Sequence, residues 1–194
     1  MPPLTWALHE NGVHENIQGA WADFSYRLKP PVGLRARILT AIDLYPSQLL
    51  FVHRDAEAVS HSERKQEIED VVSELRQENA INIPALCVVP VRMQEAWLLI
   101  NEAAIRRAAG NPAGRMALGL PRNNRIESTP DPKNILFEAL RTASGHTGRR
   151  LAKLHLPSLR HRVAELITDY SALRSLPAFR ALEADLQGEL HSLV

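Results

Sequence analysis

The chain has 194 residues, a hydrophobic content of 45% and a formal net charge of +1, which are ordinary values for a globular protein with one sizeable core. A single cysteine, Cys87, excludes an internal disulfide and a multi-cysteine zinc site, and its place in "ALCVVPV" predicts a buried, inert thiol. No apolar run approaches the roughly 20 residues that cross a bilayer, and the first residues lack the pattern of a signal peptide. We therefore expect a cytoplasmic protein without membrane contact.

Strands and helices are predicted to alternate over the first 110 residues, which favours an α/β fold with a mainly parallel sheet flanked by helices. Near-continuous apolar runs typify strands buried on both faces, and apolar residues three or four apart typify helices. Ser60 and Glu63 have the spacing of a capping box. The expected elements are a strand at 4–8, a helix at 33–45, a strand at 48–54, a helix at 60–79, a strand at 84–91 and a helix at 95–110.

After residue 110 the chain becomes rich in Pro, Gly and Asn, which predicts a long connection at 111–131. Helices are expected at 132–144, 157–168 and 177–193. We expect one domain over 1–194, with a sheet core at 1–110 and a helical C-terminal part at 111–194 packed on it.

Two carboxylates follow the strand in "QLLFVHRDAEA". Asp55 and Glu57 are two residues apart, so they share a face of an extended chain at the carboxyl end of the strand. Two such acids suit a hard cation such as Mg²⁺ or Mn²⁺, which would also remove their mutual repulsion. The alternative is that Asp55 caps the next turn and Glu57 is solvated.

Glu95 begins "EAWLL" shortly after the next predicted strand. If the two strands are neighbours, Glu95 lies at the same edge of the sheet as Asp55 and Glu57, and three carboxylates can hold one or two metal ions. The alternative is an acid in the first turn of a helix, where the helix dipole favours it.

Positive charge gathers in the second half of the chain, with twelve Lys and Arg against four Asp and Glu between Asn101 and Arg162. Lys133 lies in the first turn of a predicted helix, where the dipole disfavours a cation, which hints at phosphate binding. The alternative is a set of scattered, solvated helix faces. The further candidates for contact with phosphate or nucleic acid are Arg54, Arg149, Arg150 and Lys153.

Four segments resemble an uncharacterised bacterial family with a Toprim-like core: "FVHRDAEA", "VVPVRMQEAWLLINEAAIRRAAGNP", "LPRNNRIESTPDPKNILFEAL" and "LPAFRALEADL". Toprim domains occur in topoisomerases, primases and the overcoming-lysogenization-defect nucleases, and members of this family are similar to genes near ATPases in loci assigned to phage defence. The resemblance implies Mg²⁺-dependent phosphoryl transfer on nucleic acid. By that resemblance Asp55 and Glu57 match the Asp-x-Asp metal pair, Glu95 the Glu-Ala-Trp acid, and Lys133 the Asp-Pro-Lys lysine.

The resemblance also implies a departure from the family, because relatives open with a strand that ends in an acidic, Gly-containing turn and is followed by a helix. Here the chain starts at what resembles their second strand, so about thirty to forty residues would be absent. Three hypotheses follow. The chain is a Mg²⁺- or Mn²⁺-dependent nuclease, a non-catalytic partner or regulatory subunit of an ATPase, or a nucleotide-binding module.

Overall fold

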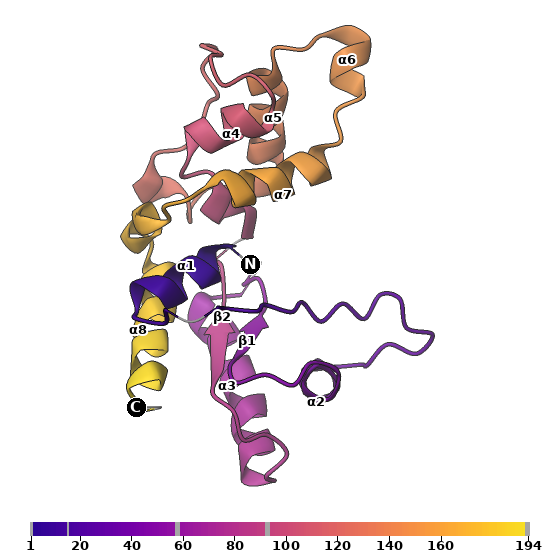
Figure 1. Cartoon of the computed structure of the whole chain (residues 1–194), viewed down its shortest axis with the longest axis vertical. Coiled ribbons are helices and arrows are strands. Elements are labelled where there is room, and N and C mark those ends of the chain that lie inside the picture. Colours follow the sequence, from indigo (N-terminus) through magenta and orange to yellow (C-terminus); the bar gives the residue numbers. More distant parts are fainter. Residues whose placement is uncertain (1, 15, 57–58, 92–93, 193–194) are drawn as a thin grey trace.

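The computed structural model describes residues 2–14, 16–56, 59–91 and 94–192 and shows an α/β chain that is rich in helix (Figure 1). Within these residues the elements, in order, are α1 (Pro2–Glu10), α2 (Leu34–Leu44), β1 (Leu50–His53), α3 (His61–Gln77), β2 (Ala85–Val88), the 3-10 helix η1 (Gln94–Leu98), α4 (Glu102–Ala108), η2 (Asn123–Arg125), α5 (Pro132–Ser144), α6 (Gly148–Ala152), α7 (Leu156–Leu166), η3 (Ser171–Ser175) and α8 (Pro177–Ser192).

The α/β class is confirmed at the coarse level, because β1 and β2 pair in parallel with α3 between them in the chain. The sheet of the described residues has these two strands. Val52 of β1 lies opposite Cys87 of β2, and His53 lies opposite Val88. The predicted order of strand, helix and strand is therefore correct over 48–91.

Successive residues of β2 point into two different hydrophobic clusters, as the period of two along a strand requires. Leu86 and Val88 belong to a large cluster that includes Trp97. Cys87 and Val52 belong to a smaller cluster with residues of α3. α3 and α8 both contact β2, so the strand pair lies between them (Figure 1).

The predicted strand at 4–8 is wrong, because this segment is part of helix α1. Leu4, Ala7 and Leu8 are buried on one side of the helix at spacings of three and four residues. Trp6, on the same helix, packs against the rings of Tyr170 and Phe179, with 6.2 Å between ring centroids in both pairs. Contacts with the end of the chain thus select the helix.

The predicted helix at 95–110 is also corrected, since the structure divides it into η1 and α4. Asn101 starts α4 as its N-cap, and its side-chain oxygen accepts a hydrogen bond from the backbone N–H of Ala104 at 2.9 Å. The helices expected near 132–144, 157–168 and 177–193 are present as α5, α7 and α8. Residues 193 and 194 lie outside the described part. The short helices α6, η2 and η3 were not predicted.

We predict that Ser60→Ala lowers the free energy of unfolding by about 1 kcal/mol, because it removes the N-cap of α3. The Ser60 hydroxyl accepts from the Glu63 N–H at 3.1 Å, and the Glu63 carboxylate accepts from the Ser60 N–H at 2.8 Å. Urea unfolding measures the change. Ser73→Ala, at an exposed position of the same helix, is the matched control, and equal stability of the two variants would contradict the role of the cap.

Candidate functional site

The carboxyl ends of β1 and β2 meet at one edge of the sheet, as expected for neighbouring parallel strands. Backbone pairing continues past both strands, because the Arg54 N–H donates to the Val88 carbonyl at 3.1 Å and the Ala56 N–H donates to the Pro90 carbonyl at 3.0 Å. Asp55 is thereby held between two backbone contacts, beside the end of β2. This is the position at which open α/β sheets bind their ligands.

Asp55 faces His53 at this edge. Among the described residues, five polar side-chain atoms are buried and have no hydrogen-bond partner. Two of the five, His53 Nε2 and Asp55 Oδ1, lie at this edge of the sheet. These two atoms lie 3.4 Å apart, and the side chains keep 17% and 27% of their surface exposed. An imidazole nitrogen and a carboxylate oxygen thus lie close together. Both atoms are buried, but their side chains are partly exposed to solvent.

The sequence analysis did not identify His53 as a site residue, although a signal for it existed. His53 and Asp55 are two residues apart in an extended segment and so share a face. Trp21 adds a third side chain, since its ring centroid lies 6.1 Å from that of His53. Glu57, the predicted partner of Asp55, lies outside the described residues, so the carboxylate pair stays a prediction.

Glu95 lies in η1 and is buried, with 8% of its surface exposed. The guanidinium Nη1 of Arg160, on α7, donates to Glu95 Oε1 at 2.7 Å. The charge of Glu95 is therefore balanced by a cation of the chain itself. The sequence predicted Glu95 either as a metal ligand or as an acid in the first turn of a helix. Neither prediction included Arg160, which lies 65 residues away in the chain.

A metal site built from three acids is not assembled by the side chains that the structure describes. Over 2–14, 16–56, 59–91 and 94–192, no three His, Cys, Asp or Glu side chains form a group that could hold a metal ion. The structure consequently does not join Glu95 to His53 and Asp55 as ligands of one ion. Any third ligand from the chain would have to come from outside these ranges, where Glu57 lies.

The predicted phosphate-binding residues are dispersed over the molecule. Lys133 is exposed in the first turn of α5, with its ammonium 6.0 Å from the ring centroid of Phe137. Arg149, Arg150 and Lys153 are exposed in or just after α6, which lies far from β1 and β2 in Figure 1. These four cations do not surround Asp55.

Arg54 is the predicted cation nearest to the candidate site, but it is engaged with α3. Its Nη1 donates to Glu67 Oε2 at 3.0 Å, and the same oxygen accepts from Arg64 at 2.6 Å. The Arg54 side chain is 40% exposed, so this pair is a weak, solvated one.

Cys87 is buried as predicted. Burial raises the pKa of its thiol to about 11, and the nearby carboxylate of Glu69 adds to the increase. The thiol contacts the Lys65 carbonyl at 3.9 Å. A neutral, enclosed thiol is a poor nucleophile, which agrees with the inert role expected from the sequence.

No protein-family model matches the chain, and no curated protein or solved structure is significantly similar to it. Within the described residues, no helix is both long and apolar enough to span a bilayer.

We predict that Arg160→Met lowers the free energy of unfolding by about 2 kcal/mol, because it leaves the Glu95 carboxylate buried without its cation. The cost is at the low end for a buried pair, since the Arg160 side chain is 32% exposed. Adding Glu95→Gln to this variant should recover part of the loss. Urea unfolding measures both changes.

Arg162→Met, which changes an exposed arginine of the same helix, is the matched control. Equal stability of the Arg160 and Arg162 variants would contradict a structural role for the Glu95–Arg160 pair. A variant Arg160→Met that is restored by Mn²⁺ alone would instead mark Glu95 as a metal ligand.

We predict that Cys87 in the native protein reacts with a disulfide reagent at pH 8 about two to three orders of magnitude more slowly than in the urea-unfolded chain. A pKa of about 11 leaves little thiolate at pH 8, and the fraction rises tenfold with each pH unit. Release of the chromophore, followed by absorbance, measures the rate. A native rate close to the unfolded one would show that Cys87 is an accessible thiolate.

Proposed function

We propose that the chain is a divalent-metal-dependent phosphoryl-transfer protein with a Toprim-like sheet, and that it acts as a nuclease on nucleic acid. The observation that supports this most directly is the pair of enclosed atoms, His53 Nε2 and Asp55 Oδ1, at the carboxyl ends of two parallel strands. A nitrogen and an oxygen without other hydrogen-bond partners at that edge are atoms of the kind that bind a divalent metal.

His53 and Asp55 would hold the ion through these two atoms, which lie 3.4 Å apart. Mg²⁺ prefers oxygen ligands, whereas Mn²⁺ also accepts imidazole. The pair therefore favours Mn²⁺ over Mg²⁺, and Glu57 is the further ligand that the sequence suggests. Bound there, the ion would supply Lewis-acid polarisation of a phosphoryl oxygen.

Basic residues of the chain would bind the phosphates of the nucleic acid. Arg54, next to Asp55 and only weakly held by Glu67, would move to the phosphate and balance its charge. Lys133, Arg149, Arg150 and Lys153 lie apart from Asp55, so we assign them to the nucleic-acid backbone beyond the scissile phosphate. Lys133, which the resemblance matches to the Asp-Pro-Lys lysine, keeps its expected contact with phosphate in this proposal.

A non-catalytic partner or regulatory subunit of an ATPase is the second candidate. The observation that favours it is the Glu95–Arg160 pair, because an acid expected at the metal is instead used to hold η1 against α7. In that function the His53–Asp55 edge would be a remnant, and the α5–α7 surface would carry the contact.

We predict that Mn²⁺ binds the wild-type chain at one site and that Asp55→Ala and His53→Ala each weaken this binding at least about tenfold. Each substitution removes one of the two proposed ligands. Isothermal titration calorimetry measures the affinity. Asp43→Ala, which removes an exposed carboxylate of α2, is the matched control and should bind like the wild type.

Cleavage of single-stranded DNA and RNA with Mn²⁺ then tests the activity. Loss of cleavage in Asp55→Ala, with an unchanged thermal unfolding curve, supports the nuclease. Binding of Mn²⁺ that is equal in wild type and Asp55→Ala contradicts the site. A wild-type chain that neither binds Mn²⁺ nor cleaves nucleic acid contradicts the nuclease and favours the regulatory-subunit hypothesis.

A further inference from the structure

One edge of β2 is free of backbone partners among the described residues. The pairing with β1 uses the backbone of alternate residues, including the carbonyls of Pro84, Val88 and Pro90. The N–H and C=O groups of Ala85 and Cys87 therefore point away from β1, and no hydrogen bond to the described part of the chain satisfies them. Such an edge is a template for an added strand.

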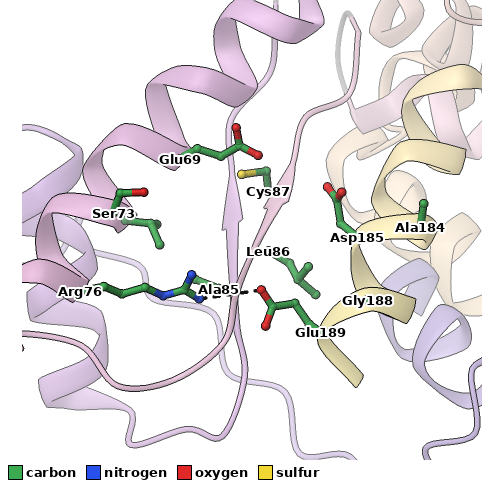
Figure 2. Close-up of a pocket in the computed structure, with 11 residues that line it drawn as sticks. Glu69, Ser73, Arg76, Ala85, Leu86, Cys87, Ala184, Asp185, Gly188 and Glu189 are labelled. Carbon is green, nitrogen blue, oxygen red and sulfur yellow. Dashed lines mark ion pairs between the residues drawn. The ribbon is translucent and has the colours of Figure 1, made fainter. Parts of the chain in front are cut away.

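The free edge lies in a groove between α3 and α8, with a volume of about 530 Å³ (Figure 2). Ser73 lines it from α3, and Ala184 and Gly188 line it from α8. A glycine in the middle of a helix weakens the helix unless another group needs the space. A Cβ added to Gly188 would meet no atom within 4 Å, so room for a further backbone exists beside β2.

The groove admits a single extended segment and not a second β2. An incoming β2 would bring its own α3 and α8, which flank its free edge and would collide with those of the first copy. An extended segment without flanking helices avoids this collision. It would bind by strand addition, with backbone hydrogen bonds to β2 and side chains directed toward the two helices.

The charges of the groove favour a basic segment. Three acids line it, Glu69 of α3 and Asp185 and Glu189 of α8, against one lining base, Arg76. Lys65 of α3 lies beside the groove, 2.7 Å from Asp185 and 3.6 Å from Glu69, so three acids share two bases and a net negative charge remains. Arg76 and Glu189 span the groove at 3.9 Å, as Figure 2 shows, and both are partly exposed. A pair at this distance and exposure is weak, so an incoming cation can replace Arg76 beside Glu189.

The chain itself carries a segment of this kind. The connection between α1 and α2 extends away from the body on the side opposite α8 (Figure 1). Within it Tyr26 and Leu28 are 90% and 103% exposed, and they alternate with Arg27 and Lys29, which are exposed as well. The alternation of apolar and basic residues is that of a strand with one apolar face and one basic face.

We propose that the segment Tyr26–Lys29 of one copy docks on the free edge of β2 in a second copy. Its four residues match the four of β2, and Pro30 and Pro31 end the pairing because they have no N–H to donate. Arg27 and Lys29 face Asp185 and Glu189 on the α8 wall, and Tyr26 and Leu28 pack on the α3 wall. Reciprocal exchange of the segment between two copies gives a closed dimer. The inference does not depend on the proposed metal site.

Docking requires the segment to become extended. The turn at 25–26, held by the hydrogen bond from the Arg27 N–H to the Phe24 carbonyl at 3.2 Å, and the bend at 28–29 both straighten. The exposed apolar surface of Tyr26 and Leu28 is removed from water at the same time, which favours association.

We predict that the full-length chain forms a dimer at micromolar concentration, and that two sets of substitutions each weaken it at least about tenfold. Tyr26→Ser with Leu28→Ser removes the apolar face of the segment. Gly188→Leu fills the groove, whereas the control Gly188→Ala raises helix propensity as leucine does but leaves the groove open. Sedimentation equilibrium measures the dimer, and thermal unfolding checks that each variant is folded.

A synthetic peptide of residues 23–32 gives a second readout. It should bind the double variant at Tyr26 and Leu28, whose grooves are intact, and fail to bind Gly188→Leu. A monomeric wild type that does not bind the peptide overturns the proposal. A dimer that survives both sets of substitutions also overturns it, since another surface then forms the contact. Loss of oligonucleotide binding in the double variant, without any dimer in the wild type, would assign the segment to nucleic acid instead.

Discussion

The parallel pairing of β1 with β2 is the contact on which the other features of the structure depend. It places a two-stranded sheet between two hydrophobic clusters, and the alternate residues of β2 belong to one cluster or the other. Leu86 and Val88 join the strand to the cluster of Trp97, and Cys87 joins it to the cluster under α3. The same pairing holds Asp55 beside Pro90 and leaves one edge of β2 free.

Several charged side chains have partners of opposite charge within the chain. Arg160 balances Glu95, and Lys65 of α3 binds Asp185 of α8 at 2.7 Å. Arg174 contacts Glu183 at 2.7 Å as well. The first two pairs join elements that are distant in sequence, and the third joins the neighbouring elements η3 and α8. His53 and Asp55 differ from them, because their facing atoms lie enclosed without hydrogen bonds.

Local signals predicted the parts of the fold that local interactions determine. The cap at Ser60 and the apolar spacing of α3 and α5 are contained in short stretches of sequence, as are the buried runs of β1 and β2. The segment 4–8 misled because five apolar-rich residues fit either a strand or a helix, and only its packing on the end of the chain decides between them. Asn101 carried a readable signal for a new helix, but the helical pattern on both sides of it concealed the break.

The position of Asp55 was predictable for the same reason, since the edge at which parallel strands end follows from the order of strand, helix and strand. The partner of Glu95 was not, because no local pattern relates Glu95 to Arg160 across 65 residues and a helical bundle. His53 was read only as part of a strand, although its spacing from Asp55 places both on one face. Sequence reasoning thus located the edge of the sheet but not the set of side chains that meets there.

The two proposals about this chain concern two regions of the same sheet, the carboxyl end of β1 and the free edge of β2, and the backbone connects them. A strand added along Ala85 and Cys87 would restrain β2 just before Val88 and Pro90, whose carbonyls accept the hydrogen bonds of Arg54 and Ala56. These two bonds fix the backbone on either side of Asp55. Association would therefore limit the motion of the proposed metal ligand, and a bound ion would in turn stabilise the edge on which the second copy docks. Because binding free energies are coupled reciprocally, each event would favour the other.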